Sequence, residues 1–255
     1  MSVRLTIFRI VTNLARALEI CAEAVMRPED LIRLNHRFYA QMVWNQDDHD
    51  VTRGLHDWEQ QLIGSLATRG RALACGCGTG REVIGLARLG FQVMGVDIVE
   101  TVVERARENA RKAGMEADFE VQDITTLSLS KGPFDLVTLL GYPYSLIPTR
   151  RKRIEMLSRI RSVLTPNGRC LINFYTRQCT KRQQWVHRLR KLVAFVTFGN
   201  RECQVGDIIH QGAFFTHFFQ DPKEIEEEAR AAEFQIERLD FHHEQGGHAL
   251  LTHAS

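Results

Sequence analysis

A loop of alternating glycines, Gly76-Cys-Gly-Thr-Gly80, has the composition to hold a nucleoside-bearing ligand. Glycine adopts backbone angles closed to other residues, which lets a ligand approach main-chain N–H groups at the start of a helix. An apolar segment precedes the loop, and the next apolar segment ends at Asp97, seventeen residues beyond Gly80. A carboxylate at the end of a second parallel strand is placed to accept hydrogen bonds from ribose hydroxyls. These residues predict a nucleoside site at neighbouring strand ends.

The spacing of the glycines separates two kinds of nucleoside site. A dinucleotide fingerprint reads Gly-x-Gly-x-x-Gly and would need a glycine where this chain has Arg81. The loop reads Gly-x-Gly-x-Gly and resembles motif I of the class I S-adenosylmethionine-dependent methyltransferases. In that family the residue two before the first glycine is usually an acid that orders the loop and the methionine end of the cofactor, and here it is Ala74. We interpret Ala74 as a tolerated variant; the alternatives are weakened cofactor binding and a non-catalytic scaffold.

The resemblance implies cofactor-binding residues at successive strand ends and on one helix above them. Acids after the second and third strands would hold the ribose and the adenine amino group, and their apolar neighbours would pack on adenine. The end of the fourth strand would lie beside the sulfonium, and a tyrosine on the second helix would meet the carboxylate end. The implied cofactor is S-adenosylmethionine, with S-adenosylhomocysteine as product. The residues are Tyr39, Gly76, Cys77, Gly78, Thr79, Gly80, Asp97, Ile98, Asp123, Ile124, Leu140 and Gly141.

Three residues are candidates for the acceptor side of the site. Tyr142 and Tyr144 follow the fourth predicted strand, at the family's motif IV, and are expected to line the acceptor space; Tyr142 is also a candidate catalytic residue. His217 lies among phenylalanines and is the best candidate general base, because histidine titrates near neutrality. The alternative for His217 is a hydrogen-bonded structural histidine. No metal site is predicted, since Cys75-x-Cys77 has no partner pair at ligand spacing.

The elements that position these residues alternate regularly. Strands are expected over 72–75, 92–97, 117–121, 134–140 and 169–174, with helices over 80–88, 100–113 and 149–163 between them. Such alternation with short links predicts a parallel sheet with helices on both faces. Segments 235–242 and 248–253, joined by a glycine turn, predict a hairpin. The expected α/β fold is a doubly wound, mostly parallel seven-stranded sheet with an antiparallel C-terminal hairpin strand.

Two further parts flank this sheet in the sequence. Residues 1–68 are predicted to form an N-terminal helical cap, with helices over 29–44 and from Asp50 or Thr52 to 66. Residues 69–255 would form the Rossmann-like methyltransferase domain. Within it, residues 175–220 are an insertion after strand five, with a basic helix over 181–195, and are expected to form part of the acceptor-site lid.

The charge distribution is uneven although the net charge is only +2. Between Glu155 and Glu202 there are ten Lys or Arg and no acid, whereas from Asp221 to Asp240 eight acids face three bases. The alternatives are two faces of opposite sign and a solvated surface with mutual pairing. The six cysteines are scattered through a chain too large to need disulfides, which favours a reducing compartment and a cytoplasmic location.

The first 26 residues form an amphipathic pattern, with apolar residues on one helical face, recurring arginines and no acid before Glu19. This composition is typical of a membrane-surface or organelle-targeting helix. It is also that of an ordinary helix packed on the core or on another subunit, and so of a homodimer element. The leading function is a methyltransferase acting on a small-molecule acceptor. The alternatives are RNA modification, a lipid or quinone methyltransferase on a membrane surface, and a non-catalytic cofactor-binding scaffold.

Overall fold

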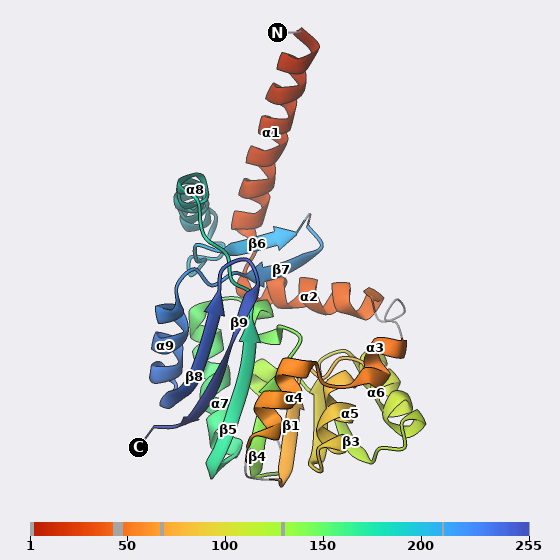
Figure 1. The fold of residues 1–255 in the computed structure, drawn as a ribbon. Helices are drawn as coiled ribbons and strands as arrows, with labels where there is room; N and C mark the ends of the chain where they lie inside the picture. Colours follow the sequence, from red (N-terminus) through yellow and green to blue (C-terminus); the bar gives the residue numbers. More distant parts are fainter. Residues whose placement is uncertain (1–2, 43–47, 67–68, 129–130, 211, 255) are drawn as a thin grey trace.

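A computed structural model describes residues 3–42, 48–66, 69–128, 131–210 and 212–254. Seven strands form one sheet in the order β3-β2-β1-β4-β5-β9-β8 (Figure 1). Strands β1 to β5 pair in parallel, and β9 is antiparallel to both β5 and β8, which confirms the predicted fold and its C-terminal antiparallel strand. The strands are β1 (Arg71–Cys75), β2 (Gln92–Asp97), β3 (Ala117–Val121), β4 (Phe134–Leu139), β5 (Leu164–Phe174), β8 (Phe234–His242) and β9 (Gly246–His253).

Helices cover both faces of this sheet because successive side chains of its central strands point alternately into two apolar layers. On β1, Ala72 and Ala74 belong to one core cluster, and Leu73 and Cys75 belong to the other. The first cluster includes α4 (Asp57–Gly64), α5 (Arg81–Arg88) and α6 (Glu100–Lys112). The second includes α7 (Arg150–Val163) and α9 (Pro222–Ala231). The site residues are therefore held between two packed layers.

The N-terminal part consists of α1 (Val3–Val25), α2 (Pro28–Met42), α3 (Asp48–Arg53) and α4. The prediction of one helix from Asp50 or Thr52 to 66 is wrong, because Gly54 takes φ +84° and His56 is extended. At Gly54 the backbone passes close to α5, and a side chain there would lie 3.2 Å from the Cα of Gly85. The chain thus turns to pack α3 and α4 on α5. The predicted end of the second helix near Trp44 lies outside the described residues.

The insertion after β5 contains α8 (Lys181–Thr197) and a two-stranded antiparallel sheet of β6 (Asp207–His210) and β7 (Phe214–His217). Figure 1 shows β6 and β7 between the large sheet and α1, α8 beside the lower half of α1, and α2 running across the same end of the molecule. A side chain of α2 contacts the small sheet directly, since the ring of Phe38 stacks on that of Phe214 with centroids 4.4 Å apart. The insertion therefore supports α2 from the side.

Candidate functional site

A cavity of about 640 Å³ lies at the carboxyl ends of β1, β2 and β4, with α2 as one wall. This is where ligands bind in open α/β sheets, because the helices on the two faces separate there. Of the predicted cofactor residues, all but Gly80 line the cavity. The lining residues drawn from the predicted set are Tyr39, Gly76, Cys77, Gly78, Thr79, Asp97, Ile98, Asp123, Ile124, Leu140 and Gly141.

The glycine loop has the conformation that its composition predicts. Gly76, Gly78 and Gly80 all take positive φ, at +70°, +53° and +97°. A side chain at Gly78 would meet no atom within 4 Å, so the loop leaves open space over its backbone there. Gly80 lies outside the cavity and caps α5, where its Cα packs against Ala106 of α6. The loop therefore fits a ligand that approaches the main chain closely.

Asp97 ends β2 and faces the cavity beside this loop. Its Oδ2 accepts a hydrogen bond from the Gly78 N–H at 3.0 Å, and its Oδ1 accepts one from the Val99 N–H at 3.0 Å. Burial raises the pKa of Asp97, although these main-chain donors and the nearby His36 oppose the rise. Each carboxylate oxygen keeps a lone pair for a further donor. The arrangement suits a pair of vicinal hydroxyls, as the resemblance implies.

Asp123 follows β3 and caps a short 3₁₀ turn, Ile124–Thr126. Its Oδ1 accepts hydrogen bonds from the main-chain N–H of Thr125 at 2.8 Å and from the Thr125 hydroxyl at 2.7 Å. Among the described residues, no donor is bonded to its Oδ2. One oxygen thus fixes the side chain while the other can accept from a ligand amino group.

The helix α2 contributes a stripe of side chains to the cavity, and sequence reasoning found only one of them. Tyr39 lines the cavity as predicted, and burial raises its pKa to about 12, so the phenol stays protonated at neutral pH. Ile32, Asn35 and His36 also line the cavity. They lie seven, four and three residues before Tyr39, which is the spacing of one helical face. This helical spacing relative to Tyr39 is the feature of the sequence that could have identified the three residues.

Asn35 holds α2 in place over the cavity. Its Nδ2 donates to the main-chain oxygen of Leu146 at 2.9 Å, in the loop after β4. Its Oδ1 accepts from the N–H of Phe215 on β7 at 2.7 Å. The amide is buried, so both hydrogen bonds are shielded from water. Asn35 therefore ties the cavity wall to the body and to the insertion.

A buried carboxylate that the sequence did not indicate, Glu82, also lines the cavity. It is the second residue of α5, and its Oε2 lies 3.4 Å from the hydroxyl of Thr138, the residue that pairs with Ala74 in the sheet. Its Oε1 is buried and has no hydrogen-bond partner in the described chain. Burial raises the pKa of Glu82 well above its usual range, against the opposing charge of Arg81. This oxygen can therefore accept a hydrogen bond from a donor outside the described chain.

Arg81 occupies the position where a dinucleotide fingerprint needs glycine. Its guanidinium is paired in bidentate fashion with the buried Glu59 of α4, with N–O distances of 2.6 and 3.0 Å. It also donates to the main-chain oxygen of Gly54 at 3.0 Å. Arg81 thereby fixes α4 and the turn before it against the start of α5.

The predicted acceptor residues lie elsewhere than the sequence suggested. Tyr142 stacks on Tyr175 with ring centroids 3.9 Å apart, and Tyr144 is fully buried with its hydroxyl donating to Glu228. Neither tyrosine is among the residues that line the cavity. The ring of Tyr144 stacks on that of Phe219, which holds Tyr144 beneath the loop that follows β4. Between these two residues, Pro143 does line the cavity.

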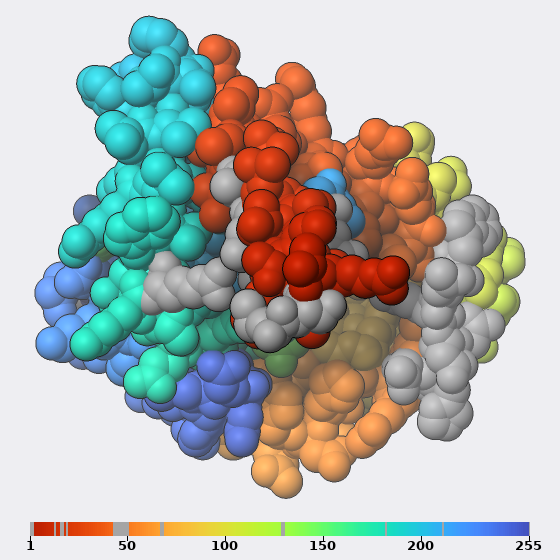
Figure 2. Space-filling view, turned by 90° about the horizontal axis from the view of Figure 1, so that it is seen from above, coloured from red at the N-terminus to blue at the C-terminus, as the bar shows by residue number. Residues whose placement is uncertain are grey.

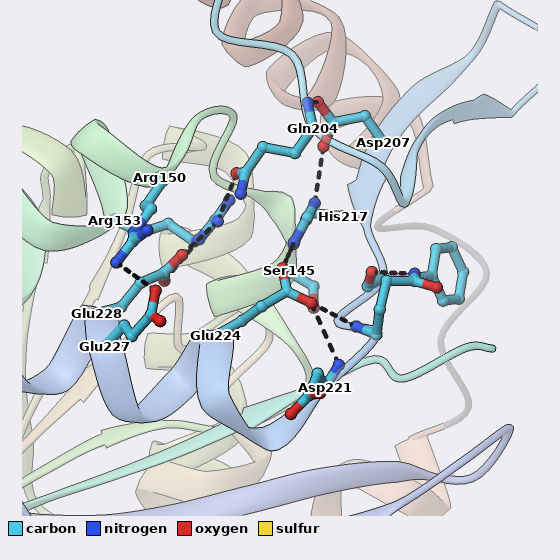
Figure 3. A network of polar contacts seen from close by, with 12 residues as sticks. Ser145, Arg150, Arg153, Gln204, Asp207, His217, Asp221, Glu224, Glu227 and Glu228 are labelled. Carbon is cyan, nitrogen blue, oxygen red and sulfur yellow. Dashed lines mark hydrogen bonds and ion pairs between the residues drawn. The ribbon is translucent and has the colours of Figure 1, made fainter. Parts of the chain in front are cut away.

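His217 is fully buried and does not line the cavity. Its Nδ1 lies 2.7 Å from Oδ1 of Asp207, and its Nε2 lies 3.6 Å from Oε2 of Glu224 (Figure 3). Burial and Arg153 disfavour the imidazolium, but these two carboxylates outweigh them and raise the pKa of His217. The placement agrees with the structural alternative for this histidine and gives a general base no access to the cavity.

A buried ion pair continues this network beneath the loop after β4 (Figure 3). Arg153 of α7 and Glu228 of α9 are both inaccessible to water, with N–O distances of 2.6 and 2.9 Å. Arg153 also donates to Gln204 of the insertion at 2.7 Å. The carboxylate of Glu228 accepts from Tyr144, so the pair links two helices, the loop and the insertion.

In the described part of the chain, no three His, Cys, Asp or Glu side chains lie together as they would around a metal ion. Part of the charged surface is paired. Arg161, Arg169 and Arg190 bind Glu233, Glu237 and Glu23 at 3.0, 2.7 and 2.5 Å. The basic interval and the acidic segment thus pair with each other in part, as the mutual-pairing alternative predicted.

Residues 72–168 of this chain match the methyltransferase domain family. An S-adenosyl-L-methionine-dependent Diels-Alderase of Talaromyces variabilis is 28% identical over 173 residues, 64% of this chain and 56% of its own. A ubiquinone biosynthesis O-methyltransferase of Xanthomonas euvesicatoria is 29% identical over 108 residues, 42% of this chain and 44% of its own. The chain therefore spans about half the length of these curated relatives.

A solved structure agrees with the fold. A SAM-dependent methyltransferase from Methanosarcina mazei superposes with a TM-score of 0.60 at 20% identity, over 79% of this chain and 99% of that one. At this identity the likeness concerns the fold alone. The overall fold is thus shared with this solved structure.

Proposed function

We propose that the chain, whose residues 72–168 match the methyltransferase domain family, is a class I S-adenosylmethionine-dependent methyltransferase that transfers a methyl group to a small-molecule acceptor. The observation that carries the proposal is the cavity, in which the glycine loop, Asp97 and Asp123 converge under α2. Its volume lies in the range of small-molecule sites. Bound S-adenosylmethionine supplies an electrophilic methyl group on a sulfonium, which an acceptor displaces in line.

The residues present fit this cofactor. Asp97 has free lone pairs for the ribose hydroxyls, Asp123 has one free oxygen for the adenine amino group, and the open backbone at Gly78 admits a close ligand. The contribution of the chain to the reaction is to hold both reactants close and dry. The apolar part of the cavity wall favours an acceptor with apolar surface; it includes Ile32, Met42, Val51, Val102, Leu146 and Ile147.

We also propose that Glu82 takes the place of the acid that is missing at Ala74. Ala74 and Thr138 are neighbours on β1 and β4, and the Glu82 carboxylate lies against Thr138 from the α5 side. Its orphaned oxygen can accept from the ammonium group at the methionine end of the cofactor. A carboxylate on the helix after the glycine loop would then bind the methionine end of the cofactor. In the family this role usually belongs to an acid on the strand before the loop.

Glu82→Gln should weaken S-adenosylhomocysteine binding about tenfold and leave 5′-methylthioadenosine, which lacks the amino-acid end, unaffected. The reason is that a charge-assisted hydrogen bond to an ammonium is worth about 1.5–3 kcal/mol. Burial raises the pKa of Glu82, so the free site holds its proton, and an incoming ammonium favours the ionised form. Binding should therefore release a proton and strengthen as the pH rises. Titration calorimetry in two buffers of different ionisation enthalpy measures both effects.

The control for this prediction is Glu120→Gln on β3, outside the residues that line the cavity. It should change neither affinity nor proton release. An equal loss of affinity for both nucleosides in Glu82→Gln would contradict the role in ammonium binding. The family assignment would survive that result, because it depends on the nucleoside end.

The reaction itself is tested by offering donor labelled in the methyl group to the purified chain with fractionated small metabolites and, in a separate assay, with total RNA. Label in a small product supports the proposal. Tight cofactor binding without transfer to any fraction would instead support a scaffold, and label in RNA would support RNA modification. We propose a cytoplasmic location, in keeping with six free cysteines in a reducing compartment.

A further inference from the structure

The first helix and the insertion helix expose a large apolar surface that no described part of the chain covers. On α1, eight apolar side chains between Val3 and Leu18 are 53–73% exposed. On α8 and the residue after it, Trp185, Leu192, Phe195, Val196 and Phe198 are 62–69% exposed. Single exposed apolar residues are ordinary, but a contiguous set of this size marks an interaction surface.

The two helices lie together at one end of the molecule. Figure 1 shows α1 projecting away from the sheet with α8 beside its lower half, and Figure 2 shows both from above. They contact each other, and Arg190 of α8 pairs with Glu23 near the end of α1. Burial of α1 is confined to this end, where Ala24 is 1% exposed and packs near Gly199. Most of α1 therefore has no packing partner among the residues described.

Five of the eight exposed apolar residues of α1 form one stripe. Val3, Ile7, Val11, Leu14 and Leu18 follow one another at intervals of three or four, which places them on one helical face. Arg9 falls on the opposite side of the helix by the same periodicity, near the apolar Leu5. A helix with an apolar stripe and basic residues opposite is suited to lie in a lipid interface.

Charge decides between a lipid surface and a second copy of the chain. The sequence has no acid before Glu19 and none between Glu155 and Glu202, so all the charged residues of α8 are basic. Its Arg188 and Lys191 are exposed. A symmetric contact between two such surfaces would bring like charges together, whereas anionic lipid headgroups would neutralise them.

We propose that α1 and α8 form a docking surface for an anionic lipid bilayer. The helices lie on the surface and do not cross it: none in the described chain is long and apolar enough to span a membrane. The α1 stripe and the exposed rings of α8 enter the interface, and the basic residues meet the headgroups. Since α2 follows α1 after only two residues and forms one wall of the cavity, docking would hold the cavity near the lipid.

The test is sedimentation of the full chain with phosphatidylcholine vesicles, with and without phosphatidylserine. The wild type should bind the anionic vesicles, with binding that weakens as salt is raised. Ile7→Ser/Val11→Ser/Leu14→Ser should lower the partition coefficient about a hundredfold through the loss of apolar contact. Arg188→Gln/Lys191→Gln should lower it about fivefold for each charge removed. The control Val121→Ser changes an exposed apolar residue on β3 and should have no effect.

Fluorescence gives a second readout at the surface itself. The exposed Trp185 should shift its emission to shorter wavelength when anionic vesicles are added, and Trp185→Phe should abolish that shift. Equal binding to neutral and anionic vesicles would overturn the proposal. So would wild-type binding by the α1 variant, or a dimer in sedimentation that this variant dissociates while no vesicle binding is seen. None of these outcomes bears on methyl transfer, which is assayed without lipid.

Discussion

Asp97→Ala should weaken S-adenosylhomocysteine binding about a hundredfold. Asp97 faces the cavity with a lone pair free on each oxygen, and a hydrogen bond to a charged group contributes about 1.5–3 kcal/mol. Losing two such bonds costs about 3 kcal/mol, or roughly a hundredfold in affinity. The variant also removes the acceptor of the Gly78 N–H, which loosens the glycine loop. Titration calorimetry on both proteins measures the change.

The nucleoside 5′-methylthioadenosine separates this effect from that of Glu82. Asp97→Ala should weaken its binding as strongly as that of S-adenosylhomocysteine, because both ligands carry the ribose. Asp118→Ala, which removes an exposed carboxylate paired with Lys131, is the matched control and should bind like the wild type. Equal affinity of Asp97→Ala and wild type would refute the assignment of this carboxylate.

Arg153→Met should lower the free energy of unfolding by about 3–5 kcal/mol. The substitution leaves the Glu228 carboxylate buried and without its counter-charge, and such an unpaired charge is strongly destabilising. Arg153→Met/Glu228→Leu removes both charges and should be more stable than the single variant. Urea unfolding followed by circular dichroism measures the three proteins.

The control for the ion pair lies on the same helix. Arg151 is exposed and pairs with Glu155 and Glu202 at 2.9 and 3.2 Å. Because solvent screens such pairs, Arg151→Met should change stability by about 0–1 kcal/mol. A loss at Arg153 no greater than that at Arg151 would show that the buried network contributes little to stability.

The sheet and the residues at the strand ends that line the cavity were predictable because local patterns determine them. Strand ends in a parallel sheet meet at one edge, so an acid after each strand is placed by the strand alone. The positive φ of Gly76, Gly78 and Gly80 follows from their residue type. Ile32, Asn35 and His36 share a helical face with Tyr39, and the same periodicity would have found them.

The positions of Glu82, Tyr144 and His217 depend on contacts between distant segments. Periodicity places Glu82 on α5 but does not reveal that its oxygen lacks a donor, since that depends on Thr138, 56 residues away. His217 lies in a buried strand, but its acidic partners come from the paired strand β6 and from α9. The break at Gly54 likewise follows from close packing on α5.

The clamp at Asn35 gives the site a kinetic property. Ligand that is enclosed under α2 can leave by that side only if the buried hydrogen bonds to Leu146 and Phe215 break together. Loss of these two hydrogen bonds is therefore expected to shorten the residence time of a bound nucleoside. Because Phe215 belongs to the insertion, a molecule that binds the insertion is expected to change the rate of product release.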